Sequence, residues 1–145
     1  MPDPYNLQRF LDAQNDVYTD VVRELTAGRK TSHWMWFIFP QIKGLGLSST
    51  ARHFAISSLD EARAYLEHPI LGARLRECTR LVNHIENASL DKIFGSPDNL
   101  KFRSSVTLFL TASGAGSADQ QLFAGALEKY SRGEPDSMTL SLLKS

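Results

Sequence analysis

The sequence has one cysteine among 145 residues, no net charge and no long apolar run. A single thiol, Cys78, cannot form an internal disulfide, which favours a reducing compartment. The densest apolar run, residues 34–39, is far shorter than the roughly 20 residues that a membrane-spanning helix needs. The N-terminal segment MPDPYNLQRF has neither the basic start nor the apolar stretch of a secretory signal. We therefore expect a cytoplasmic protein with no membrane association.

The balance of charge limits the partners further. The chain carries 16 basic and 16 acidic residues, so it has no general electrostatic attraction for a nucleic acid, and we expect no nucleic-acid partner. Its length and its hydrophobic content of 42% are typical of one globular domain. No internal repeat or long linker divides the chain, which predicts a single domain over residues 1–145.

Apolar residues recur every three or four positions in several segments, which is the spacing of one helix face. The first such segment predicts one helix over residues 7–25, ended by Gly28. A capping-box pattern, Ser-x-x-Glu, begins a shorter helix at residue 58. The clearest stripe covers residues 71–85, with charged residues on the remaining sides.

Cap residues predict further helices in the C-terminal half of the chain. Ser89 caps a single turn, and Asp119 caps a helix that ends at Gly133. Asp136 begins a last short helix through Leu143. Together these segments predict an all-α fold, a compact single-domain multihelical array of about six to eight helices.

The segment that follows Ser96 permits two structures. Pro97 at the first helical position and Asp98 in the first turn are typical of a helix start. The alternation of side chains from Val106 to Leu110 is also typical of a strand. A lone strand would need a partner that the rest of the chain barely offers, so we predict a helix.

The stretch KTSHWMWFIFPQIKGLG, residues 30–46, concentrates aromatic side chains. Its length alone would fit a buried strand, but we predict one or two turns of helix from Trp34 to Phe39 in the centre of the core. Pro40 disfavours helix at the residue before it. A buried indole N–H needs an acceptor, and the nearby groups that offer one are Gln14, Ser32, Gln41 and backbone carbonyls.

Polar residues and glycines border this stretch, and two interpretations remain open. The stretch is simply the hydrophobic core, or one edge of it forms the wall of a small-molecule pocket rimmed by His33, Gln41 and Lys43. Gly44 and Gly46 also allow backbone N–H groups to turn inward before a helix that starts near residue 48 and carries a basic residue, Arg52. Such a corner could hold phosphate or carboxylate, although a short connection with glycines is most often only a connection.

Several familiar chemistries are disfavoured. The segment AGRKTS resembles the end of a phosphate-binding loop but has Arg29 where the motif needs glycine. Cys78 lies on the apolar stripe of its predicted helix, where a thiol is usually an inert packing group. No two of the four histidines have the helical spacing of metal ligands, so we predict neither a metal site nor a cofactor. The four are His33, His53, His68 and His84.

Three segments, SHWMWFIFPQIKGLG, EARAYLEHPILGARL and IFGSPDNLKFRSSVTLF, resemble the bacterial family of domain of unknown function 1810, also called Rv1873-like. The resemblance extends from Tyr5 to about Tyr130. It implies a mainly α-helical single domain and no established activity. By motif position it points to His33, Trp34, Trp36, Pro40, Gln41, Gly44 and Gly46, and to Gly95, Asp98, Lys101, Ser104 and Thr107.

The hypothesis that follows is a protein that binds a small polar or anionic metabolite in a pocket edged by the HWMWF segment. The candidate ligand-binding residues are His33, Trp34, Trp36, Gln41, Lys43, Gly44, Gly46, Asp98 and Lys101. Asp98 and Lys101 share a helix face, where they could also form only a surface ion pair. The alternative is a protein–protein interaction module without a small ligand, using the face of Arg74, Arg76 and Arg80 or a groove between helices. The sequence assigns neither an enzymatic activity nor an oligomeric state.

Overall fold

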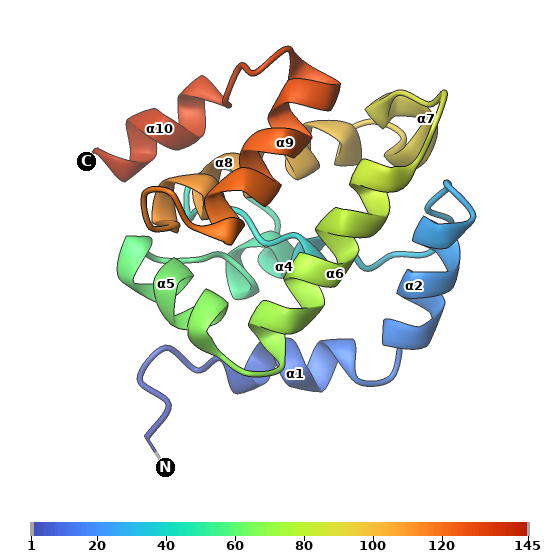
Figure 1. The fold of residues 1–145 in the computed structure, drawn as a ribbon. Helices are drawn as coiled ribbons and strands as arrows, with labels where there is room; N and C mark the ends of the chain where they lie inside the picture. The colour runs from blue at the N-terminus through green and yellow to red at the C-terminus, as the bar shows by residue number, and fades with distance from the viewer. Residues whose placement is uncertain (1, 145) are drawn as a thin grey trace.

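The computed structural model describes residues 2–144, which fold into ten helices around one continuous hydrophobic core (Figure 1). The helices are α1 Gln8–Gln14, α2 Tyr18–Thr26, α3 Met35–Ile38, α4 Ser49–His53, α5 Leu59–Glu67, α6 Leu71–His84, α7 Leu90–Phe94, α8 Asp98–Ala112, α9 Ala118–Ser131 and α10 Ser137–Leu143. The all-α prediction is confirmed, but the predicted number of helices was too low. Within residues 2–144, no helix combines the length and the apolar character needed to cross a bilayer.

The first predicted helix is in fact two helices. Residues 15–17 form a turn between α1 and α2, and Figure 1 shows the two helices at a steep angle. Asn15 and Asp16 are residue types whose side chains compete with helical backbone bonding. The preceding residue, Gln14, is buried and donates hydrogen bonds to the Phe37 carbonyl at 2.7 Å and the Tyr65 hydroxyl at 3.0 Å. The break therefore lets α1 end against the core while α2 turns away.

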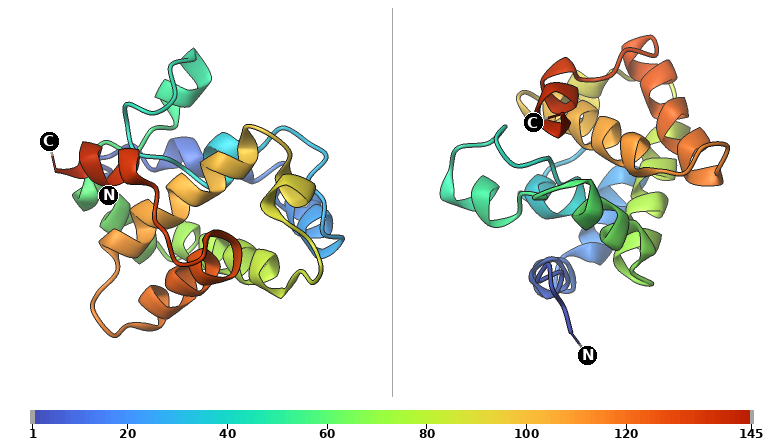
Figure 2. Two further views of the ribbon diagram at one scale, coloured as in Figure 1. Left: turned by 90° about the horizontal axis from the view of Figure 1, so that it is seen from above. Right: turned by 90° about the vertical axis from the view of Figure 1, so that its left-hand side faces the viewer.

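Helices α6 and α8 pack against most of the other long helices. Helix α8 packs against α5, α7, α9 and α10, while α6 packs against α2, α5 and α9, and Figure 2 shows α8 crossing the interior in light orange. Residues on almost every side of α8 are buried. A helix buried on all sides has no single apolar stripe, which is why its sequence also fitted a strand. The helix prediction for Val106 to Leu110 is confirmed.

The aromatic stretch forms the single-turn helix α3 in the core, as predicted. Trp34 and Phe39 are each 1% exposed, whereas Trp36 and Phe37 are only partly buried. Phe39 leaves the turn with φ −123° and ψ 74°, in agreement with the restriction imposed by the following proline.

A single parallel β bridge fixes the segment after α3. Ile42 pairs with Ile56, since the Ile56 N–H donates to the Gln41 carbonyl at 2.9 Å and the Lys43 N–H donates to the Ile56 carbonyl at 2.8 Å. This bridge places Lys43 beside Ser57, immediately before α5. It thereby joins the glycine-containing connection to the start of α5.

Two predicted helix starts have different outcomes. The Ser58 hydroxyl accepts a hydrogen bond from the Glu61 N–H and caps α5, as predicted. Helix α9 is capped by Ser117 and not by Asp119, which is the second residue of the helix. The prediction of Asp119 as the cap was wrong because Ser117 offers an equally good cap two residues earlier.

Candidate functional site

The structure does not bring all the predicted site residues together, and four of them form one cluster around Asp98. Asp98 pairs with Lys30 at 2.9 Å and with Lys101 at 3.4 Å. The Lys30 ammonium lies 5.1 Å from the Trp34 ring centroid, and the Lys101 ammonium lies 5.0 Å from that of Trp36. The Lys30 side chain is only 8% exposed. In this lysine–tryptophan cluster one carboxylate thus pairs with two ammonium groups, each of which also lies near a tryptophan ring, and these contacts join the aromatic stretch to α8.

The Trp34 indole N–H has an acceptor that the sequence analysis did not consider. It donates at 3.0 Å to Glu24, whose side chain is fully buried. The same carboxylate accepts hydrogen bonds from the N–H groups of Thr31 and Ser32 and from the Ser32 hydroxyl, at 2.7 to 2.9 Å. Burial alone raises the pKa of Glu24, but these hydrogen bonds outweigh it and lower the pKa to about 2. Glu24 is therefore an ionised anchor for the loop that leads into α3.

His33 and Gln41 lie at the two ends of the aromatic stretch. His33 is exposed, directly before the buried Trp34. Gln41 is half-buried, and its backbone carbonyl accepts the hydrogen bond from Ile56 described above. That the side chains of His33 and Gln41 contact a ligand stays a prediction.

Gly44 and Gly46 lie in the connection between α3 and α4, which packs closely against neighbouring helices. Gly44 has φ +109°, a conformation that favours glycine, and a Cβ there would lie 3.2 Å from Leu142 of α10. A Cβ on Gly46 would lie 2.4 Å from the Cβ of Ala51 in α4. The Ser48 hydroxyl caps α4 by accepting the Ala51 N–H at 3.1 Å. These glycines thus let the chain approach α4 and α10 closely, which agrees with their interpretation as a connection.

Lys43 lies beside a cavity of about 440 Å³ with an unusual concentration of basic residues. We call it the basic cavity. Helix α1 supplies Arg9, the end of α4 supplies Arg52 and His53, and the bridge supplies Lys43. The lining is completed by Tyr5, Asn6, Ala55, Ser57 and Glu61.

The one acidic residue of the basic cavity is already neutralised. Glu61 accepts a hydrogen bond from Arg9 Nη2 at 2.8 Å, and the two side chains are only 3% and 10% exposed. Its other oxygen accepts the N–H and the hydroxyl of Ser57 at 2.9 and 2.7 Å. Arg9 also donates to four backbone carbonyls, those of Tyr5, Asn6, His53 and Ala55. The Arg9–Glu61 pair therefore builds the floor of the cavity without adding net charge.

The remaining basic side chains of this cavity have no acidic partner within residues 2–144. Lys43, Arg52 and His53 take part in none of the ion pairs of the described chain. All three are exposed. The basic cavity thus has an excess of positive charge and no acidic partner for Lys43 and Arg52, whereas both lysines of the lysine–tryptophan cluster share the Asp98 carboxylate.

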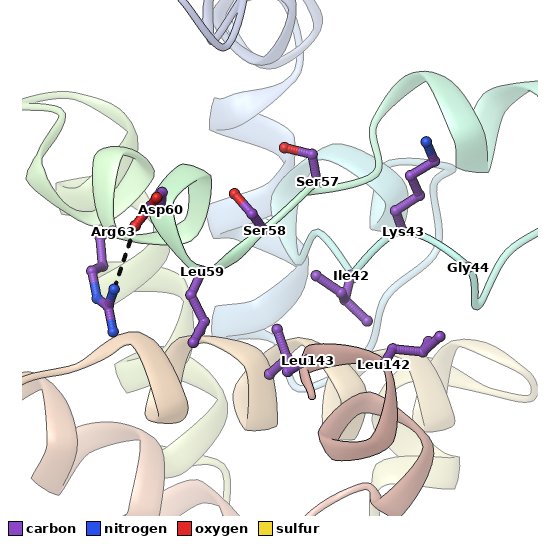
Figure 3. Close-up of a pocket in the computed structure, with 10 residues that line it drawn as sticks. All are labelled: Ile42, Lys43, Gly44, Ser57, Ser58, Leu59, Asp60, Arg63, Leu142 and Leu143. Atoms are coloured by element: carbon purple, nitrogen blue, oxygen red, sulfur yellow. Dashed lines mark ion pairs between the residues drawn. The ribbon is translucent and has the colours of Figure 1, made fainter. Parts of the chain in front are cut away.

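A second cavity, of about 700 Å³, adjoins the basic cavity at Lys43 and Ser57. Figure 3 shows Ile42 and Leu59 on one side of it and the α10 residues Leu142 and Leu143 on the other. We call it the leucine cavity. Its remaining lining residues are Gly44, Ser58, Asp60 and Arg63.

The arginine face proposed for α6 is largely occupied by contacts within the chain. Arg74 donates to Gln14 and lies 4.8 Å above the Tyr18 ring. Arg76 pairs with Asp119 through two hydrogen bonds of 2.7 and 3.0 Å. Arg80 is exposed. A protein–protein role for this face therefore stays a prediction that two of its three arginines do not favour.

Sequence reasoning missed Arg9, His53 and Ser57 as neighbours of Lys43. Arg9 and its partner Glu61 are 52 positions apart, and in the sequence each fits the polar side of an amphipathic helix. No local spacing connects them, because the contact depends on how α1 and α5 pack. The basic residue Arg52, in contrast, was identifiable from the helix start after the glycines.

The fold and these cavities define an all-helical protein with a basic, anion-compatible cavity where α1, α4 and α5 meet. Within residues 2–144, no three His, Cys, Asp or Glu side chains are grouped so that they could hold a metal ion.

The chain belongs to the family described as "Protein of unknown function (DUF1810)", whose model matches residues 4–143. It is similar to the crystal structure of the conserved hypothetical protein Rv1873 from Mycobacterium tuberculosis, with 52% sequence identity and a TM-score of 0.94 over 99% of each chain. No curated protein matches the chain. The family resemblance inferred from the three sequence segments is confirmed, and the family carries no assigned function.

Proposed function

We propose that this protein binds a small anionic metabolite in the basic cavity, with Lys43 and Arg52 holding a phosphate or carboxylate group. The observation that carries the proposal is the excess positive charge of this cavity. Among the described residues that line it, Glu61 is the single acid and pairs with Arg9 at 2.8 Å, so Lys43, Arg52 and His53 line the cavity with no other carboxylate among these residues. Charge-assisted hydrogen bonds to such an anion are among the stronger polar interactions in proteins.

The proposed site lies at the basic cavity and not at the edge of the HWMWF segment, where the sequence predicted it. Of the candidate residues, it retains Lys43 as a ligand contact and Gly44 and Gly46 as the residues that shape the connection around it. The lysine–tryptophan cluster, with Asp98 and Lys101, has a structural role in this account because both of its ammonium groups already have a carboxylate partner and a tryptophan ring.

Titration calorimetry with inorganic phosphate and pyrophosphate at low ionic strength tests the proposal. The Lys43→Ala and Arg52→Ala variants are expected to bind the anion about tenfold or more weakly, since each loses a charged hydrogen bond. Matched controls are Lys92→Ala and Arg29→Ala, which remove exposed basic residues outside the cavity. Binding that is undetectable in the unmodified protein, or that the control variants weaken equally, would contradict the proposal. Raised salt should weaken the interaction, since the cationic side chains are exposed.

A fifth variant, Lys101→Ala, separates this site from the tryptophan edge predicted from the sequence. The proposal expects it to bind anions as well as the unmodified protein does. A selective loss of binding in Lys101→Ala would instead place the site at the lysine–tryptophan cluster.

A further inference from the structure

The leucine cavity has a character unlike that of the basic cavity it adjoins. In Figure 3, the side chains of Ile42 and Leu59 face those of Leu142 and Leu143 across the open space. Leu142 and Leu143 are partly exposed and do not belong to the fully buried core. Ile42 is almost fully buried, but Leu59, Leu142 and Leu143 keep part of their surface open to water in this cavity of about 700 Å³, and such apolar surface is suited to an apolar group of a ligand.

Net charge is confined to one end of this combined space. Asp60 and Arg63 lie on the rim of the leucine cavity and pair with each other at 3.5 Å, so they add no net charge. The Lys43 side chain points away from Leu142 and Leu143 in Figure 3, while the same residue lines the basic cavity together with Arg52. The two cavities therefore offer a cationic end and an apolar end, with Lys43 at their junction.

Size also argues against a bare inorganic ion as the natural ligand. The two cavities have volumes of about 440 and 700 Å³, and each volume is within the range found for small-molecule sites. A phosphate group alone would occupy the cationic end and leave the apolar end filled with water.

We propose that the ligand is a phosphate monoester with an apolar or aromatic organic part, which lies in the leucine cavity while its phosphate contacts Lys43 and Arg52. This inference rests on the proposed function, because the phosphate is placed in the basic cavity. It adds the chemical class of the ligand, and it assigns Leu142 of α10 as a specificity-determining residue.

The attachment of α10 makes Leu142 a suitable position for a test. The start of α10 is fixed by the Asp136 N–H, which donates to the buried Thr107 hydroxyl of α8 at 2.9 Å. Leu142 lies near the other end of the helix and is only partly buried. Because alanine is a better helix former than leucine, Leu142→Ala is expected to keep α10 helical, while the bond from Asp136 to Thr107 still holds the start of the helix against α8.

The experiment compares three probes by titration calorimetry, namely inorganic phosphate, phenyl phosphate and phenol. The unmodified protein is expected to bind phenyl phosphate about tenfold more tightly than inorganic phosphate and to bind phenol more weakly than either. Leu142→Ala should remove most of the advantage of phenyl phosphate and leave the affinity for inorganic phosphate unchanged. Lys43→Ala should weaken both phosphates. Leu100→Ala, which shortens an exposed leucine outside both cavities, is the matched control.

The outcomes separate this inference from the proposed function. Equal affinity for inorganic phosphate and phenyl phosphate, or an advantage of phenyl phosphate that Leu142→Ala retains, would overturn the inference and leave anion binding intact. Phenol that binds as tightly as phenyl phosphate would also overturn it, since the phosphate would then contribute nothing. Absence of binding by both phosphates would overturn the proposed function and the inference together. If Leu142→Ala melts at a clearly lower temperature, Leu143→Ala gives the same comparison on the other leucine of α10.

Discussion

The buried carboxylate of Glu24 allows a quantitative prediction about stability. In the Glu24→Gln variant the side chain keeps its shape and one acceptor oxygen for the Trp34 indole, but it loses its charge. The pKa of Glu24 falls from the ordinary value of 4.5 to about 2 in the folded protein. Folding therefore stabilises the ionised form of Glu24, relative to the protonated form, by about 3 kcal/mol. Since glutamine resembles the protonated carboxyl group, Glu24→Gln should lower the free energy of unfolding by about 3 kcal/mol at pH 7.

The same reasoning gives the direction of the pH dependence. The pKa of Glu24 is lower in the folded state, so its stabilisation is complete above about pH 5 and is lost as the pH falls toward 2. At pH 3 the unfolded state is already protonated while the folded state is mostly ionised, and about 1 kcal/mol of the difference should remain. The gap between the unmodified protein and Glu24→Gln is thus expected to narrow steadily from pH 5 to pH 3.

Urea unfolding followed by tryptophan fluorescence measures this gap, because Trp34 is buried in the folded state. Glu86→Gln, at an exposed glutamate, is the control and should be as stable as the unmodified protein within about 0.5 kcal/mol. The reasoning would be refuted by a Glu24→Gln difference below about 1 kcal/mol at pH 7, or by a difference that stays constant down to pH 3.

Three further predictions concern the packing around the site. Asp98→Ala leaves the nearly buried side chain of Lys30 without its acidic partner and should lower the free energy of unfolding in urea by about 2 kcal/mol. Asp60→Ala, at an exposed ion pair, should lower it by less than about 1 kcal/mol. Equal losses in the two variants would contradict the structural role of the cluster. Gly44→Ala should lower the free energy of unfolding by about 1 to 2 kcal/mol because the residue has a positive φ. Gly125→Ala, inside α9 with open space around it, should raise the free energy of unfolding by about 0.5 to 1 kcal/mol. A melting temperature that neither substitution changes would refute this prediction. Burial raises the pKa of the Cys78 thiol to about 12, so a thiol reagent at pH 8 should label it only after urea is added, and prompt labelling of the folded protein would show the reasoning to be wrong.

The helices were predictable where one face of a helix is buried and the other is exposed. Residues 71–85 have this pattern, and α6 follows it closely. Helix α8 is buried on nearly all sides, so its sequence could not distinguish a helix from a strand by periodicity alone. The break between α1 and α2 was missed because the apolar spacing continues through Asn15 and Asp16, although the chain changes direction there.

The interior position of the tryptophans was predictable from composition, but their polar partners were not. Glu24 lies on the second helix, among charged residues that are usually exposed. Only the packing of α2 against the following loop turns this carboxylate inward to Trp34.

The candidate site was predictable in part for the same reason. Lys43 and the neighbouring glycines stand out beside an aromatic stretch. The other groups of the basic cavity come from α1 and the residues before it, from α4, and from α5 and the segment that leads into it. The Ile42–Ile56 bridge and the Arg9–Glu61 pair bring these elements together, and neither has a local sequence signature.

The most direct test of the central claim is a titration with phenyl phosphate that follows the backbone amide signals in ¹H–¹⁵N NMR spectra. The account predicts that the amide signals of Lys43, Arg52 and Ser57 shift with a common saturation curve, while those of Trp36 and Lys101 stay in place. Saturable shifts confined to Trp36 and Lys101 would contradict the account, and so would a spectrum that does not change.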